Sequence, residues 1–126
     1  MNPTTVVCGY EEGTKDDNYA ILKENYEVLL QSLDQNGKKL NVIKLPMPGT
    51  VGNQEKRLPA SYANFYIGNK TVLVPIFGHK NDKLALSIIQ DQFPDRKVAG
   101  VNCVDLVYGL GTIHCITQQQ PSVQLG

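Results

Sequence analysis

The chain has 126 residues, of which 41% are hydrophobic and 19% charged, a balance typical of one globular domain. Its zero formal charge argues against nucleic acid or an anionic membrane as a partner, because both select a basic surface. No apolar run approaches the roughly 20 residues that cross a bilayer, and the first residues do not resemble a secretory signal. The odd set Cys8, Cys103 and Cys115 forms no disulfide framework, so we expect a reducing, cytoplasmic setting.

The first periodic pattern predicts a helix within residues 15–37, KDDNYAILKENYEVLLQSLDQNG. Apolar side chains recur there at spacings of three, four and seven, as on one face of a helix. Asp16, Asp17 or Asn18 can cap its start, and Asn36-Gly37 can close its end. A strand is predicted next in residues 39–48, KLNVIKLPMP, followed by a polar loop from Gly49 to Pro59.

Residues 60–78, ASYANFYIGNKTVLVPIFG, contain two β-rich runs that are broken by Gly68-Asn69-Lys70, which is typical of a hairpin. Pro75 cannot donate to a sheet, so it should place the second run at an edge or have its side without an N–H group unpaired. A second helix is predicted in residues 81–93, capped by Asn81 or Asp82 and ended by Pro94. Strands are predicted in residues 97–103 and 112–118. This order indicates one α/β module repeated, and such modules need neighbours to cover their faces.

The stretch YGLGTIHCITQQQP, residues 108–121, sets His114 beside Cys115. In a strand, consecutive side chains face opposite sides, so these two can neither chelate one ion together nor form a base–nucleophile pair. His114 is therefore expected to be packed or hydrogen-bonded on the reverse face. His79, Cys8 and Cys103 lack zinc-site spacing, so we expect no metal.

The spacing leaves two interpretations of Cys115 open. Free cysteine is often a small core hydrophobe. Gly109 and Gly111 instead suit a backbone that approaches a ligand or presents N–H groups. Thr117 and the glutamines at 118–120 are an unusual continuation for a buried strand. Core thiol and nucleophile are thus equally favoured by composition.

The segment GLGTIHCITQQQP resembles the carboxy-terminal active-site motif of agmatine deiminases, which is close to G-G-G-x-I-H-C-I-T-Q-Q-x-P. KLNVIKLPMP, LPASYANFYIGN, VLVPIFG and FPDRKVAGV resemble successive segments of that family, in the right order and over nearly the whole chain. The resemblance implies an α/β fold of repeated ββαβ-type modules from a five-bladed pentein α/β propeller. Residues 1–126 would be the carboxy-terminal part of a single domain, roughly its last two blades.

The same resemblance implies hydrolysis of agmatine to N-carbamoylputrescine and ammonia, a step toward putrescine. Cys115 aligns with the nucleophile, whose thiolate attacks the guanidinium carbon and forms an amidino-cysteine. Gly109, Gly111 and Asn64 are expected at the substrate, although the backbone alone can satisfy a polar residue such as Asn64. The expected partner is a small guanidine compound, with no cofactor, metal, nucleic acid or membrane.

The resemblance also shows departures. The family's histidine, in a G-H-V-D-type motif, and most of its guanidinium-binding carboxylates have no counterpart here. We therefore expect a chain that is inactive alone and that forms a homo-oligomer or associates with the missing amino-terminal blades. Leu110 replaces a glycine, and His79 replaces an aspartate. The alternatives are a non-catalytic remnant or interaction module, and a peptidylarginine or arginine deiminase. Peptide hydrolysis by Cys115 with His79 has little support.

Overall fold

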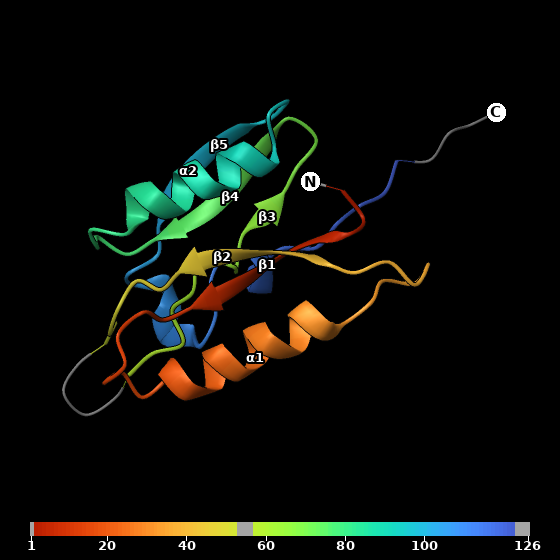
Figure 1. Ribbon diagram of the computed structural model, residues 1–126. Helices are drawn as coiled ribbons and strands as arrows, with labels where there is room; N and C mark the ends of the chain where they lie inside the picture. Colours follow the sequence, from red (N-terminus) through yellow and green to blue (C-terminus); the bar gives the residue numbers. More distant parts are fainter. Residues whose placement is uncertain (1, 53–56, 123–126) are drawn as a thin grey trace.

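The computed structural model describes residues 2–52 and 57–122, which fold into two β-α-β units. The first unit contains β1 (Thr5–Tyr10), α1 (Tyr19–Gln31) and β2 (Asn41–Pro46); the second contains β3 (Tyr66–Ile67), β4 (Thr71–Ile76), α2 (Asp82–Gln92) and β5 (Lys97–Asn102). Two 3₁₀ turns follow, η1 (Leu106–Gly109) and η2 (His114–Ile116). Figure 1 shows the units stacked, with α1 on the outside of the first. The expected mixed α/β class is confirmed.

Each unit pairs two parallel strands that are joined through a helix. β1 runs beside β2 from the pair Thr5–Asn41 onward, and β4 runs beside β5 from Thr71–Lys97 onward. The predicted hairpin is confirmed, because the two-residue strand β3 pairs antiparallel with β4. Parallel strands need a crossover of a dozen or more residues, which α1 and α2 supply.

Three strand predictions need correction. β1 was not predicted, because its short run TVVCGY is barely distinguishable from a loop without the partner β2. β4 is the central strand, so the edge alternative for Pro75 is wrong. The other alternative agrees with the structure, because β3 pairs only with Val72 and Leu73 of β4 and Pro75 lies beyond that pairing. Residues 112–118 are not a strand: His114–Ile116 form a 3₁₀ turn, because local and loop contacts override their β-propensity.

The first helix is shorter than predicted and ends at Gln31. Ser32 is extended, and its hydroxyl donates to the carbonyl of Val28 at 2.8 Å. The Asp34 carboxylate then accepts the N–H groups of Asn36 and Lys38. The left-handed Gly37, with φ 75°, therefore closes a separate turn and not the helix. Residues 53–56 of the predicted loop lie outside the described residues.

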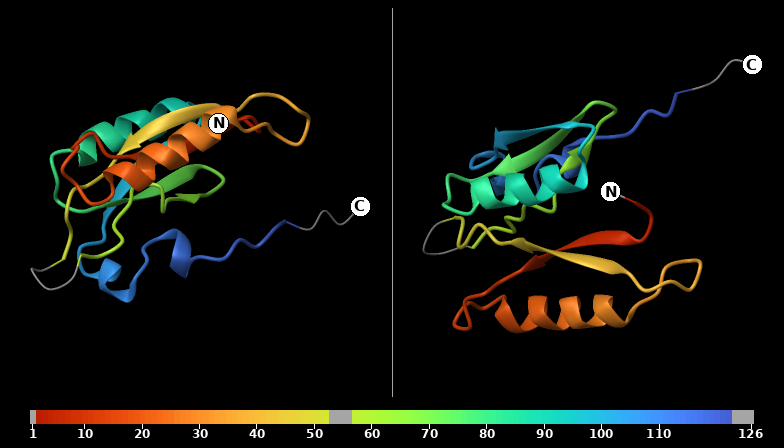
Figure 2. Two further views of the ribbon diagram at one scale, coloured as in Figure 1. Left: turned by 60° about the horizontal axis from the view of Figure 1, so that its bottom comes forward. Right: turned by 45° about the horizontal axis from the view of Figure 1, so that its top comes forward.

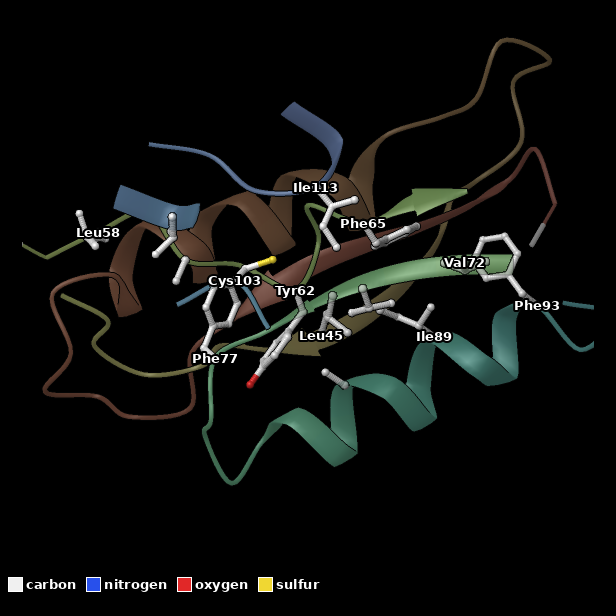
Figure 3. Close-up of a cluster of buried hydrophobic side chains, with 14 residues drawn as sticks. Leu45, Leu58, Tyr62, Phe65, Val72, Phe77, Ile89, Phe93, Cys103 and Ile113 are labelled. Carbon is white, nitrogen blue, oxygen red and sulfur yellow. The ribbon is translucent and has the colours of Figure 1, made fainter. Parts of the chain in front are cut away.

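The core gathers around β4, with α2 on one side and the segment after β5 on the other (Figure 3). Ala85 and Ile89 of α2 are fully buried, as are Val72 and Val74 of β4. In the right view of Figure 2, α2 lies between its own strands and β2, which contributes the buried Leu45. No helix of the described residues is long and apolar enough to cross a membrane.

A partly buried polar contact fixes the loop that precedes β3. The Asp82 carboxylate accepts hydrogen bonds from the Tyr62 hydroxyl at 2.6 Å and from the Gly78 N–H at 2.9 Å. It also accepts longer hydrogen bonds from the N–H groups of Phe77 and His79. Asn81 is the N-cap residue of α2, but no described side chain accepts a hydrogen bond from the first turn of the helix, and the Asp82 carboxylate instead holds the loop before it. Burial, with the hydrogen bond to Asp82 second, raises the pKa of Tyr62 well above its ordinary value. This contact holds residues 60–65 against α2.

Candidate active site around Cys115

The three thiols occupy different environments, and all three are free. Cys8 and Cys103 are buried, and burial raises the pKa of each because the thiolate loses solvation. Cys115 is exposed at the turn η2. The core-thiol interpretation of Cys115 is therefore wrong. Thiolates react and thiols do not, so the exposed sulfur is the candidate for chemistry.

Asn64 holds Cys115 by its side-chain amide. The Oδ1 atom of Asn64 accepts the Cys115 N–H at 3.3 Å, and its Nδ2 atom donates to the Cys115 sulfur at 3.1 Å. The Asn64 carbonyl also accepts the His114 N–H at 3.3 Å. Asn64 lies in the loop just before β3, not within a strand as predicted. The structure thus joins two predicted site residues that are 51 positions apart.

The two glycines upstream of Cys115 differ in their surroundings. A Cβ atom on Gly111 would lie 2.7 Å from the Cys115 sulfur and 2.8 Å from its Cβ atom, closer than real contacts allow. A Cβ atom on Gly109 would meet nothing within 4 Å. Gly111 is therefore required for the packing of Cys115, whereas the structure gives Gly109 no comparable constraint.

Leu110 stands between these glycines in the left-handed region, with φ 68°. Among the described residues, every other residue with a positive φ is a glycine. The Leu110 side chain is exposed. A side chain in this region costs roughly 1–2 kcal/mol. Leu110 therefore places backbone strain in the turn that precedes Gly111.

His114 and Cys115 both line an open hollow of about 370 Å³, together with Ser61, Ala63 and Asn64, so they are not separated onto two faces as the predicted strand required. His114 also lines a second hollow, which it shares with Tyr66 and Thr117. His114 is also exposed, so the expectation of a packed residue is wrong. The physical reason is the 3₁₀ turn, which does not alternate side chains between two faces as a strand does.

Ser61 and Ala63 are site residues that the sequence did not single out. Ser61 accepts the Ala63 N–H at its side-chain oxygen, at 3.2 Å, and the Asn64 N–H at its carbonyl, at 3.3 Å. These bonds form the tight turn that carries Asn64. The signal available was the small polar run ASYAN between apolar residues, which is typical of a turn.

His79 is not among the described residues that line the hollow. Its Nδ1 atom accepts the Asn81 N–H at 3.1 Å, and its ring packs against the left-handed Gly49. Peptide hydrolysis by Cys115 with His79 thus gains no geometric support.

No described residue that lines the hollow carries a carboxylate, and within residues 2–52 and 57–122 no three His, Cys, Asp or Glu side chains gather as a metal site. Residues 60–64 and 111–116 therefore supply a thiol, its hydrogen-bond donor and an imidazole.

Comparison with known proteins places this site in a family. The model of the Porphyromonas-type peptidyl-arginine deiminases matches residues 1–121. A Lactococcus lactis protein named "Putative agmatine deiminase" is 43% identical over 97% of this chain and 38% of its own length. The solved agmatine deiminase of Enterococcus faecalis has a TM-score of 0.88 and 39% identity, covering 94% of this chain and 37% of that one. A C. jejuni agmatine deiminase, solved as a cysteine-to-serine variant with substrate bound, has a TM-score of 0.79 and 28% identity over 88% of this chain and 32% of that one.

A mixed α/β chain with an exposed, hydrogen-bonded thiol after a glycine turn fits this group of enzymes, and the chain belongs to the Porphyromonas-type peptidyl-arginine deiminase family. The relatives compared above carry the name agmatine deiminase, which confirms the resemblance seen in the sequence. The chain spans about two fifths of the length of the relatives it matches.

Proposed function

We propose that this chain supplies the nucleophile of an agmatine deiminase, with Cys115 as the attacking group. The observation that carries the proposal is the exposed Cys115 sulfur, which accepts the Asn64 amide at 3.1 Å inside a family match over residues 1–121. A C. jejuni relative was solved as a cysteine-to-serine variant with substrate bound, which is in keeping with a reacting thiol in this family.

The reaction has two steps. The Cys115 thiolate adds to the guanidinium carbon of agmatine, and the carbon–nitrogen bond to one terminal nitrogen breaks after that nitrogen gains a proton, which releases ammonia. Water then adds to the amidino-cysteine carbon, the carbon–sulfur bond breaks with its electrons on sulfur, and N-carbamoylputrescine leaves. The thiolate is regenerated and two protons are released. This chemistry supplies a precursor of putrescine without a cofactor.

The residues of this hollow meet part of these demands. A planar guanidinium is held best by carboxylates in paired hydrogen bonds, and a proton must reach the leaving nitrogen. The described lining residues include one imidazole, that of His114, and no carboxylate. We infer that further elements of the whole enzyme complete the site, and that residues 1–126 form the carboxy-terminal part of one pentein domain. The two β-α-β units would be two of its five blades.

The uncovered surfaces of this chain support association with such elements. Ile21 and Val28 of α1 are 61% and 58% exposed, and β1 and β2 form a sheet of only two strands. A sheet of this size is marginal without cover. We infer self-association, or binding to the amino-terminal blades, in a reducing cytoplasmic setting that keeps the three free thiols reduced. Sedimentation showing a compact monomer that melts cooperatively would contradict this inference.

The test is complementation. The chain is mixed with the amino-terminal region of the L. lactis relative, and ammonia and N-carbamoylputrescine are measured with agmatine. Cys115→Ala should abolish turnover, while the matched control Cys8→Ala should retain it, and acid quenching should trap an adduct on Cys115. The chain by itself should be nearly inert, since loss of a general acid costs about 10²–10⁴-fold. Full turnover by Cys115→Ala, or robust turnover by the chain without the partner, would contradict the proposal.

The family description favours a second candidate, a peptidyl-arginine deiminase. The chemistry at sulfur is the same, so the substrate must decide. We expect kcat/KM of the complemented protein to be highest for agmatine, with free arginine and a peptide containing arginine far lower. Preference for the peptide would support the second candidate. Absence of turnover with all three would favour a non-catalytic remnant or interaction module.

A further inference from the structure

Asn64 contacts the sulfur and the backbone of the same residue, which a polar residue that merely satisfies a loop would not do. Its Oδ1 atom accepts the Cys115 N–H at 3.3 Å, while its Nδ2 atom lies 3.1 Å from the Cys115 sulfur. The orientation of this amide is fixed by chemistry. A backbone N–H can only donate, so Oδ1 must face it, and the NH₂ group must face the sulfur.

The turn that carries Asn64 is held at several points. The Asn64 N–H donates to the Ser61 carbonyl at 3.3 Å, and its own carbonyl accepts the His114 N–H. Two residues earlier, the buried Tyr62 donates its hydroxyl to Asp82 at the start of α2. Figure 3 shows Tyr62 inside the core, with its hydroxyl directed toward that helix. The amide is therefore set by the folded second unit and does not depend on a bound substrate.

We propose that Asn64 is a positioning residue for the Cys115 thiol: its NH₂ group stabilises the thiolate, and its carbonyl oxygen fixes the turn that presents the sulfur. The inference rests on the proposed function in taking Cys115 as the reacting group, and it replaces the expected substrate contact of Asn64. A donor hydrogen bond favours the charged form of its acceptor, so the thiolate gains relative to the thiol. His114 is the competing neighbour, because among the described residues that line the hollow it is the titratable group besides Cys115.

The test measures alkylation of Cys115 by iodoacetamide in the full chain between pH 5.5 and 10, with the modified peptide quantified by mass. Asn64→Asp keeps the shape and the acceptor oxygen but replaces the donor with a charged oxygen, which itself disfavours the thiolate, so the uncharged Asn64→Ala decides the test. Asn64→Ala loses both groups. Asn25→Asp and Asn25→Ala, at an exposed position of α1, are the matched controls. His114→Gln tests whether the imidazole, rather than Asn64, stabilises the thiolate.

Loss of a hydrogen bond to the thiolate should change the equilibrium between thiol and thiolate by about tenfold or more. Asn64→Asp and Asn64→Ala should therefore move the midpoint of the alkylation profile upward by about one pH unit. The Asn25 variants and His114→Gln should keep the wild-type midpoint. A change in access alone would alter the plateau rate at high pH without moving the midpoint. An unmoved midpoint in Asn64→Ala, or a shift of the same size in His114→Gln, would overturn the proposal.

Circular dichroism will show whether the Asn64 variants fold. If they do not, a second measurement that needs no variant tests whether Asn64 stabilises the thiolate. The thiol in the folded chain is compared with the same thiol in a synthetic peptide of residues 111–118. The folded chain should have the lower midpoint, because the peptide keeps His114 but lacks Asn64. Equal midpoints would overturn the proposal. Since no substrate is used, a shifted midpoint together with no turnover by the complemented protein would contradict the proposed function while leaving this inference in place.

Discussion

The two β-α-β units share a connection pattern but differ in how their helices are covered. In the second unit, α2 buries Ala85 and Ile89, and the helix itself lies between its own strands and β2 (Figure 2, right). In the first unit, none of the 13 described residues of α1 is buried. α1 contacts its sheet through half-buried residues. The ring centroids of Tyr26 and Tyr10 lie 5.4 Å apart in a T-shaped contact. The Lys44 Nζ atom lies 4.0 Å from the centroid of the Tyr10 ring.

The comparison shows that the second unit supplies most of the core, to which the first unit adds Leu45 of β2, and that α1 contributes no buried residue. The site follows the same division. Figure 2 (left) shows the segment that carries η1 and η2 on the side of β4 away from α2, and its Val107 and Ile113 are buried in the shared core. Cys115 is thus presented by the better-packed half of the chain, which suits a group that needs a fixed position.

The largest expected effect contrasts the two helices directly. Ile89→Ala should lower the free energy of unfolding by about 2–5 kcal/mol, because Ile89 is fully buried and leaves a cavity. Ile21→Ala should change it by less than about 0.5 kcal/mol, since Ile21 is 61% exposed. Urea unfolding measures both. A large cost for Ile21→Ala would mean that the outer face of α1 is covered in solution.

The next effect concerns the glycines before Cys115. Gly111→Ala places a Cβ atom 2.7 Å from the Cys115 sulfur, so we expect a loss of about 1–3 kcal/mol and slower alkylation of Cys115. Gly109→Ala is the matched control, because its new Cβ atom meets nothing within 4 Å. Equal stability and equal alkylation of the two variants would show that the sulfur is not seated against Gly111.

A smaller effect on stability is expected from the ion pair between Arg57 and Asp16. Arg57 donates to both carboxylate oxygens of Asp16, at 2.8 and 3.0 Å, and this hydrogen bonding lowers the pKa of Asp16. Because the folded pKa is the lower one, the stabilisation is present above about pH 4 and is lost as the pH falls through the folded value. For a partly exposed pair it amounts to at most about 1 kcal/mol.

Asp16→Asn should therefore remove this stabilisation at pH 7 and have almost no effect at pH 2. Thermal unfolding at both pH values provides the measurement, and Asp91→Asn on the exposed side of α2 is the control. If Asp16→Asn costs as much at pH 2 as at pH 7, the carboxylate charge is not what holds the contact.

The smallest effect is expected at Leu110. Leu110→Gly should raise the free energy of unfolding by up to about 1 kcal/mol, since relief of the left-handed strain exceeds the added flexibility of the unfolded chain. Leu110→Ala keeps the strain and should not be stabilising. Differential scanning calorimetry distinguishes the two. Equal melting temperatures would show that the turn before Cys115 is relaxed.

The sequence determined the two helices, the strands β2, β4 and β5, and the hairpin at residues 68–70, because each is encoded by local periodicity or turn chemistry. It also marked Cys115 and Asn64 as site candidates, through a motif resemblance rather than through spacing. These local patterns cannot say which surfaces meet, so they left the exposure of Cys115 undecided.

Tertiary structure decided the rest. β1 becomes a strand by pairing with β2. Residues 114–116 become a 3₁₀ turn because Asn64, which is distant in sequence, accepts hydrogen bonds from the N–H groups of His114 and Cys115. The turn also brings His114 to the same hollow as Cys115, which a strand would have prevented. Contacts between residues 51 positions apart are invisible to periodicity, and here they determine both the backbone conformation and the surroundings of the thiol.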